Sequence, residues 1–332
     1  MNSEELDFIL YLKQLPEELL ASNNFTLAEK QSMFTRMVRK VELEVNTFCN
    51  RKCSFCGNSF LDRFNKKEPM SWETYGVLLT DLKNINYSET LVFGRYSEPL
   101  ASPRILEYVA LARKELPKAT ISILSNGDYL TREYLESLSA AGLSRMSISL
   151  YPNMHEWNTE NSRRMIETFC QRLELEALPF REHPESIHFS GKYKSLEVAV
   201  RATNILKFGH DRASSLPELT IPDFVRTSPC FMPIFTVNID HDGKMLLCCN
   251  TRSDDPNHQD FVFGELKKEN DLYHNFFNSH FLKWRKILLS GEAKPHPCST
   301  CKQRDDLNAN LYSKVGNQME AKFSHSEKKK VT

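Results

Sequence analysis

Residues 41–56 read Val-Glu-Leu-Glu-Val-Asn-Thr-Phe-Cys-Asn-Arg-Lys-Cys-Ser-Phe-Cys. Apolar and polar residues alternate over 41–47, which predicts a β-strand. This strand leads directly into Cys49, Cys53 and Cys56, at the spacing C-x3-C-x2-C. The stretch therefore predicts a cysteine-bearing loop at the carboxyl end of a strand.

Strand-like and helix-like segments alternate after this loop. Such alternation is typical of a parallel sheet covered by helices, in which ligands bind at the carboxyl ends of the strands. We therefore expect an α/β fold, namely a partial (β/α)6 TIM-like barrel with a small C-terminal domain of a β-hairpin plus a helix. The predicted barrel segments are helix 71–83, strand 90–93, helix 103–115, strand 120–124, helix 132–141, strand 145–150, helix 160–174 and strand 196–203.

The character of the sequence changes near residue 217. A proline-flanked linker covers 217–229, a hairpin with the turn Asp-His-Asp-Gly covers 235–248, and a helix covers 271–289. The predicted division is an N-terminal helical cap at 1–39, the barrel at 40–216, a cysteine-rich domain at 217–310 and a tail at 311–332.

Composition excludes several classes of protein. The 332 residues carry 43 basic and 43 acidic side chains, and binders of nucleic acid or of anionic membranes normally have a basic surplus. No stretch is long and apolar enough to cross a membrane, and the acidic start does not resemble a secretory signal. We therefore expect a cytoplasmic protein, with neither nucleic acid nor membrane as partner.

The nine cysteines are clustered in short-spaced groups, which favours metal ligation over disulfides in a large chain without an export signal. The three thiolates of Cys49, Cys53 and Cys56 can hold three irons of a cubane cluster and leave the fourth iron open. A zinc site is the alternative, but zinc usually has four protein ligands in a structural site.

The loop Cys49-Asn-Arg-Lys-Cys53-Ser-Phe-Cys56 resembles the radical S-adenosylmethionine superfamily. The resemblance implies a four-iron four-sulfur cluster whose open iron binds the amino and carboxylate groups of S-adenosylmethionine. It further implies that an electron cleaves this cofactor to a 5′-deoxyadenosyl radical, which abstracts a hydrogen atom from the substrate. A flavodoxin or ferredoxin is the expected electron donor.

Two residues near this loop resemble cofactor-binding residues of the superfamily. Phe55 resembles the aromatic residue that meets the adenine. Glu98 resembles the end of the Gly-Gly-Glu element that receives the methionine ammonium, although Arg95, Tyr96 and Ser97 stand where glycines are common. The alternative for Glu98 is an ordinary loop carboxylate.

Three further residues resemble cofactor ligands on later strands. Asn126, in Ser-Asn-Gly, resembles the turn near the ribose, but Asn-Gly is also a general turn signal. Ser149 and Arg201 resemble the pair that binds the methionine carboxylate, for which a guanidinium is well suited. The alternatives are a serine that ends a strand and an arginine paired with Glu197.

A second cysteine group consists of Cys230, Cys248, Cys298 and Cys301. The patterns Gly243-x4-Cys248-Cys249 and Pro297-Cys298-x2-Cys301 resemble the twitch domain, a shortened relative of the SPASM domain, and this resemblance implies one auxiliary 4Fe–4S cluster. Four thiolates also suit a structural zinc. Cys249 is left over beside a ligand, and it is either a hydrogen-atom donor to a substrate radical or a small buried residue. Cys170 is expected in the core. The expected auxiliary ligands are Cys230, Cys248, Cys298 and Cys301.

The resemblance leaves the reaction open. Cys249 favours epimerisation of a small polar substrate, such as a sugar or aminocyclitol, with this thiol as hydrogen donor. The alternatives are two-electron dehydrogenation of a secondary alcohol through the auxiliary cluster, maturation of a short ribosomal peptide, and a non-catalytic iron–sulfur or zinc protein. Acidic residues such as Asp211 and Asp240 either line a substrate pocket or lie in solvated loops.

Overall fold

The computed structural model describes residues 24–65, 67–152, 157–177 and 180–303. These residues form two compact units. Unit 2 contains Lys40–Gly209 and Ile239–Gly243. Unit 1 contains the described residues of Met1–Arg39, together with His210–Asn238 and 244–303.

Five parallel strands form the centre of unit 2. They are hydrogen-bonded in the order β1, β2, β3, β4, β8, and β1 pairs with β2 from Lys40↔Thr90 to Leu43↔Phe93. Their apolar side chains are buried, as expected for strands of a parallel sheet. The bounds are β1 Lys40–Leu43, β2 Thr90–Phe93, β3 Thr120–Ser125, β4 Arg145–Leu150 and β8 Leu196–Thr203.

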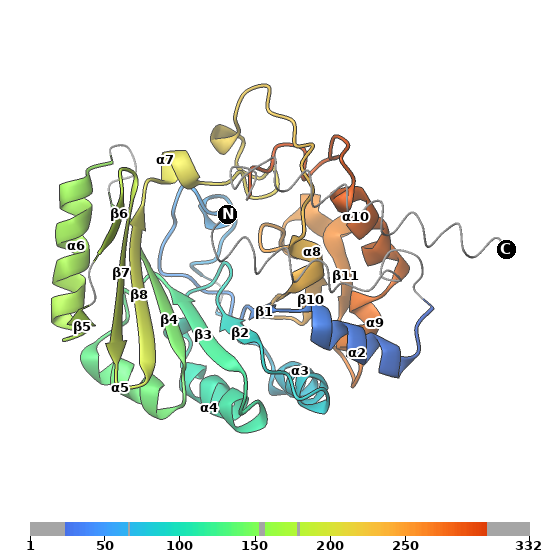
Figure 1. Cartoon of the computed structure of the whole chain (residues 1–332), viewed down its shortest axis with the longest axis horizontal. Coiled ribbons are helices and arrows are strands. Elements are labelled where there is room, and N and C mark those ends of the chain that lie inside the picture. Colours follow the sequence, from blue (N-terminus) through green and yellow to red (C-terminus); the bar gives the residue numbers. More distant parts are fainter. Residues whose placement is uncertain (1–23, 66, 153–156, 178–179, 304–332) are drawn as a thin grey trace. The chain divides into compact units, whose positions relative to one another are not determined.

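Four longer helices lie along one side of this sheet (Figure 1). Three of them start at polar N-cap residues, because Ser71, Thr131 and Asn158 each accept a hydrogen bond from a backbone N–H in the first turn. The helices are α3 Trp72–Asn84, α4 Ile105–Glu115, α5 Arg132–Ala140 and α6 Thr159–Arg172, and the short α7 spans Ile205–Phe208.

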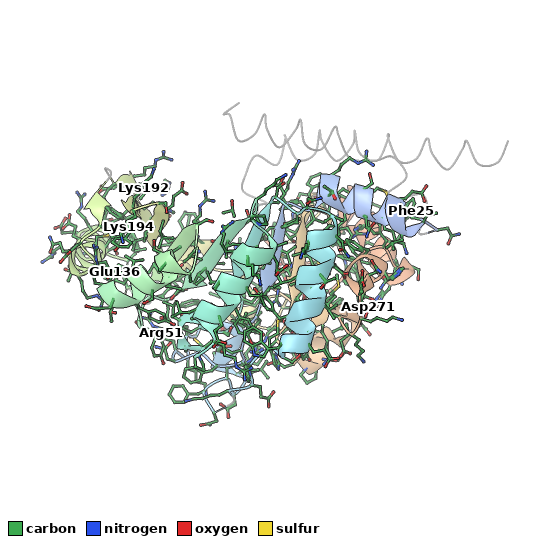
Figure 2. The ribbon with its side chains drawn as sticks, turned by 90° about the horizontal axis from the view of Figure 1, so that it is seen from below. Phe25, Arg51, Glu136, Lys192, Lys194 and Asp271 are labelled. Atoms are coloured by element: carbon green, nitrogen blue, oxygen red, sulfur yellow. The ribbon has the colours of Figure 1, made fainter. Side chains whose placement is uncertain are left out.

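An antiparallel extension of this sheet was not predicted from the sequence. β7 Ser186–Tyr193 pairs antiparallel with β8, and β5 Glu176–Ala177 and β6 Arg181–His183 pair with β7. The Tyr193 hydroxyl donates to Glu136 on α5 at 2.9 Å. Accordingly, Glu136 lies near the Lys192 and Lys194 end of β7 (Figure 2).

Unit 1 combines the N-terminal helix with the C-terminal part of the chain. The helix α2 Leu27–Met37 begins with a capping box at Thr26. The centroid of the Phe34 ring lies 5.4 Å from that of Tyr273 and 5.1 Å from that of Phe276. The other elements are α8 Met232–Phe235, β9 Thr236–Ile239, whose last residue belongs to unit 2, β10 Lys244–Leu246, β11 Val262–Glu265, α9 Asp271–Phe276 and α10 Ser279–Leu289.

The fold class predicted from the sequence, an α/β partial barrel, is confirmed by the open, parallel-rich sheet. The single helix predicted at 271–289 is wrong, because the segment forms α9 and α10. Asn278 lies between the two helices and caps the second by accepting a hydrogen bond from the Phe281 N–H at 2.8 Å. Residues 1–23 of the predicted cap and the whole predicted tail at 311–332 lie outside the described residues.

Short 3-10 helices connect several elements, at Gly57–Ser59, Pro99–Ala101, Pro217–Leu219 and Pro256–Phe261. Within the part of the chain that the structure describes, no helix is long and apolar enough to cross a membrane.

Candidate functional site

The first cysteine loop follows β1 in unit 2, as the sequence predicted, but β1 ends at Leu43 rather than at the predicted residue 47. Asn46 anchors its start, accepting from the Phe48 N–H at 2.7 Å and donating to the Glu98 carbonyl at 3.3 Å. Within the loop the Cys56 N–H donates to the Cys53 carbonyl at 3.1 Å. These bonds bend the loop, and Cys49, Cys53 and Cys56 remain partly accessible.

The thiols of this loop are close enough to influence one another. The pKa of Cys49 is raised to about 12, mainly by burial, and the negative charges of Glu98, Cys56 and Cys53 contribute to the rise. Burial also raises the pKa of Cys53, with Cys56 as the next cause. Three crowded thiolates need a positive partner, and an iron–sulfur cluster provides one. The donor set therefore fits the predicted cluster.

Glu98 is a buried carboxylate that links two loops of unit 2. Its side chain accepts from the Ser125 hydroxyl and from the Asn126 N–H, both at 2.8 Å, and from the Leu100 N–H at 3.0 Å. Burial raises the pKa of Glu98, and these hydrogen bonds oppose the rise. The structure thus brings Glu98 and Asn126, two predicted site residues, into direct contact.

A second polar network joins the cysteine loop to the loop after β3. Asp128 accepts two hydrogen bonds from the Arg51 guanidinium, at 2.7 and 2.5 Å, and one from Asn50 at 2.7 Å. Asn126 donates to the Asn50 side chain at 2.9 Å. The Arg51 guanidinium lowers the pKa of Asp128, so this carboxylate stays charged.

Tyr151 is an aromatic residue beside the loop that sequence reasoning missed. Its ring centroid lies 4.9 Å from that of Phe55, and the Arg51 guanidinium lies 5.5 Å from the Tyr151 ring. Its position directly after β4, at the carboxyl end of a parallel strand, was the available signal.

Ser149 and Arg201 are brought together as predicted. They are register partners on the parallel strands β4 and β8, and Arg201 Nε donates to Ser149 Oγ at 3.0 Å. The alternative partner of Arg201, Glu197, instead pairs with Arg145 at 2.9 Å.

The second cysteine group lines a cavity in unit 1. Burial raises the pKa of Cys248, Cys298 and Cys301, and neighbouring thiols contribute to each rise. Among the described residues, no three His, Cys, Asp or Glu side chains are placed to hold a single metal ion. The donor set and its mutual repulsion fit a cluster, as in the first group. The cavity contains the four predicted ligands Cys230, Cys248, Cys298 and Cys301, and also Cys249 and Arg226.

Cys170 and the two acidic residues Asp211 and Asp240 are all buried. Cys170 is buried in α6, as expected. Asp240 is buried and forms an ion pair with Arg95 at 3.0 Å. Asp211 is buried and accepts a hydrogen bond from Thr300. Neither carboxylate therefore lies in a solvated loop.

Comparison with protein families places both cysteine groups in known domains. Residues 43–151 match the radical SAM superfamily, and residues 230–302 match an iron–sulfur cluster-binding domain of the SPASM type. The chain belongs to the radical SAM superfamily and is a radical SAM oxidoreductase that uses S-adenosylmethionine and two iron–sulfur clusters.

Two curated proteins are similar in sequence. The S-adenosyl-L-methionine-dependent 2-deoxy-scyllo-inosamine dehydrogenase of Niallia circulans is 30% identical over 269 residues, which cover 80% of this chain and 93% of that protein. A probable GTP 3′,8-cyclase of Pyrobaculum aerophilum is 30% identical over 118 residues, or 36% of each chain.

Solved structures show the same fold. The crystal structure of BtrN in complex with AdoMet and 2-DOIA has a TM-score of 0.56 and 19% identity, covering 83% of this chain and 97% of that one. BtrN in an open conformation has a TM-score of 0.51 and 20% identity, covering 77% and 87%.

Proposed function

We propose that this protein dehydrogenates a secondary alcohol of a small aminocyclitol-like substrate. The observation that carries the proposal is the cavity in unit 1 that contains the four expected auxiliary ligands, since an oxidation needs an electron acceptor beyond the cluster that activates S-adenosylmethionine. The similarity to the dehydrogenase of Niallia circulans over 93% of its length supports the same reaction class.

When bound, the cofactors supply a 5′-deoxyadenosyl radical and an electron acceptor, so that the alcohol loses a hydrogen atom, a proton and an electron and becomes a ketone. The residues of the chain bind, orient and protect these groups. Cys49, Cys53 and Cys56 hold the first cluster, and Cys230, Cys248, Cys298 and Cys301 hold the auxiliary cluster.

The cofactor-binding residues follow from the contacts in unit 2. The Arg201 guanidinium, oriented by Ser149, suits the methionine carboxylate because it donates in a fixed fork. Glu98 suits the methionine ammonium, and its bonds to Ser125 and Asn126 hold its carboxylate in place. The rings of Phe55 and Tyr151 provide an apolar edge for the adenine.

Epimerisation is the second candidate reaction, and Cys249 favours it. This thiol lines the same cavity as the auxiliary cysteines, and a thiol can return a hydrogen atom to a substrate radical. We place epimerisation second for two reasons. The chain is similar in sequence to a dehydrogenase, and a cysteine beside a cluster ligand can also serve simply as a small apolar residue.

The proposal also covers the domain bounds, the cellular location and the partners of the protein. We place the barrel domain at 40–216 and the cluster domain at 217–310, in a cytoplasmic protein reduced by a flavodoxin or ferredoxin. Neither a nucleic acid nor a membrane is included as a partner, since acidic and basic residues balance at 43 each.

The test compares wild type, Cys249→Ala and Cys170→Ala after anaerobic reconstitution. Each is incubated with S-adenosylmethionine, dithionite and 2-deoxy-scyllo-inosamine in deuterated water, and products are analysed by mass spectrometry. We expect all three to form a ketone and 5′-deoxyadenosine in equal amounts. A product that keeps the substrate's oxidation state and gains one deuterium, only when Cys249 is present, would instead establish epimerisation. Cys170→Ala controls for the loss of a thiol away from the cavity.

A further inference from the structure

Arg226 is a buried cation on the wall of the auxiliary cavity. The residue is 2% exposed, and it lines the cavity with the five cysteines of unit 1. Burying a guanidinium costs free energy unless hydrogen bonds and neighbouring charges compensate it. A guanidinium buried beside several thiols therefore needs contacts that compensate for its lost hydration.

The guanidinium holds together two of the three chain segments that carry the cavity cysteines. It donates to the carbonyls of Ser228 and Pro229, at 3.1 and 3.0 Å, just before Cys230. It also donates to the carbonyls of Cys301 and Gln303, at 3.0 and 2.8 Å.

The backbone of Arg226 reinforces this arrangement. Its N–H donates to the Ser299 carbonyl at 2.8 Å, within the segment between Cys298 and Cys301. Its carbonyl accepts from the Lys294 N–H at 2.9 Å. One residue thus fixes the distance between two segments that are far apart in the sequence, since Arg226 and Cys301 are separated by 75 positions.

The charge of Arg226 also acts on the thiols. Its guanidinium is buried and lines the same cavity as Cys298 and Cys301. Water screens a buried charge only weakly, so this positive charge favours added negative charge at the same place.

We propose that Arg226 is a positioning residue that holds the segments of Cys230, Cys298 and Cys301 in place and raises the reduction potential of the cluster that the auxiliary cysteines bind. Reduction adds one negative charge, and a buried cation beside the ligands stabilises the reduced form more than the oxidised one. The inference rests on the proposed function, in which this cluster accepts the substrate electron.

The experiment isolates the auxiliary cluster in a full-length chain in which Cys49, Cys53 and Cys56 are replaced by alanine. Iron content and reduction potential are measured in this background, so the result is independent of S-adenosylmethionine cleavage and of substrate oxidation. The variants are Arg226→Gln, Arg226→Lys and the control Arg252→Gln, which alters a buried arginine that pairs with Asp254 and is absent from the cavity lining.

We expect Arg226→Gln to lower the potential, Arg226→Lys to keep it near that of the parent, and Arg252→Gln to leave it unchanged. An unchanged potential in Arg226→Gln with full iron content would overturn the proposal. If Arg226→Gln binds no iron, iron retention and a near-parental potential in Arg226→Lys support the proposal. Loss of iron from both Arg226 variants, with retention in Arg252→Gln, identifies a structural clamp only and overturns the electrostatic part.

Discussion

Arg201 on β8 donates a hydrogen bond to Ser149 on the neighbouring strand β4, and the two residues are partners in the parallel register. A hydrogen bond between neighbouring strands holds the guanidinium at the carboxyl end of the sheet. This is where ligands bind in α/β folds.

Arg201→Lys should weaken S-adenosylmethionine binding by roughly tenfold or more, because lysine lacks the planar fork that matches a carboxylate. Ser149→Ala should weaken it by about fivefold, the equivalent of one hydrogen bond. Equilibrium binding to the reconstituted protein measures both effects. Arg145→Lys is the control, because Arg145 pairs with Glu197 on the same two strands. Equal losses in Arg145→Lys and Arg201→Lys would contradict the assignment.

Asp128→Asn should loosen the first cysteine loop, because it removes the charge that holds Arg51. The side chains of Arg51 and Asp128 are 29% and 36% exposed. We therefore expect the free energy of unfolding to fall by about 1 kcal/mol or less. Iron release from the first site to a chelator should accelerate by a few-fold. Glu197→Gln, which breaks an exposed pair elsewhere in unit 2, should leave the rate unchanged. Identical release rates in wild type and Asp128→Asn would count against this role.

Gly127→Ala should destabilise unit 2. Gly127 has φ +78°, and an added Cβ would lie 2.8 Å from Ile148 Cγ2 and 2.9 Å from the Phe169 ring. We expect a loss of about 2–4 kcal/mol from backbone strain and overpacking. Gly76→Ala in α3 is the matched control, since nothing lies within 4 Å of its added Cβ, and it should stabilise the protein by about 0.5–1 kcal/mol. Urea unfolding measures both, and similar midpoints would refute the expectation.

His210 should make stability fall with acidification. Its pKa is lowered from 6.5 to about 4 by burial, with Arg212, Lys302 and Arg226 adding to the effect. Between pH 4 and 6.5 the unfolded chain therefore binds more protons at His210 than the folded chain does. The contribution of neutral His210 to folding stability is complete above pH 6.5 and is lost as the pH falls towards 4. Between about pH 7 and 5 wild type should lose about 2 kcal/mol more than His210→Gln. Parallel pH profiles in urea unfolding would show that His210 has no such effect.

Local sequence pattern predicted most of the barrel. β2, β4 and β8 have the predicted bounds of 90–93, 145–150 and 196–203, because strand alternation and flanking turn residues are local properties. The antiparallel strands around β7 were missed. β5 and β6 are two and three residues long and carry little periodic signal. β7 has eight residues with alternating burial, so its strand was readable from the sequence, whereas its antiparallel pairing with β8 depends on the tertiary structure.

Some residues of the candidate site were predicted from the sequence, and others were found only in the structure. Cysteine spacing alone pointed to two metal-binding groups, because ligand chemistry and short loops are visible in the sequence. Tyr151 beside Phe55 and Arg226 beside Cys301 emerged only from the tertiary structure. Neither contact follows from sequence spacing, since the folded backbone brings together residues that are far apart in the chain, through packing and hydrogen bonds that local periodicity does not encode.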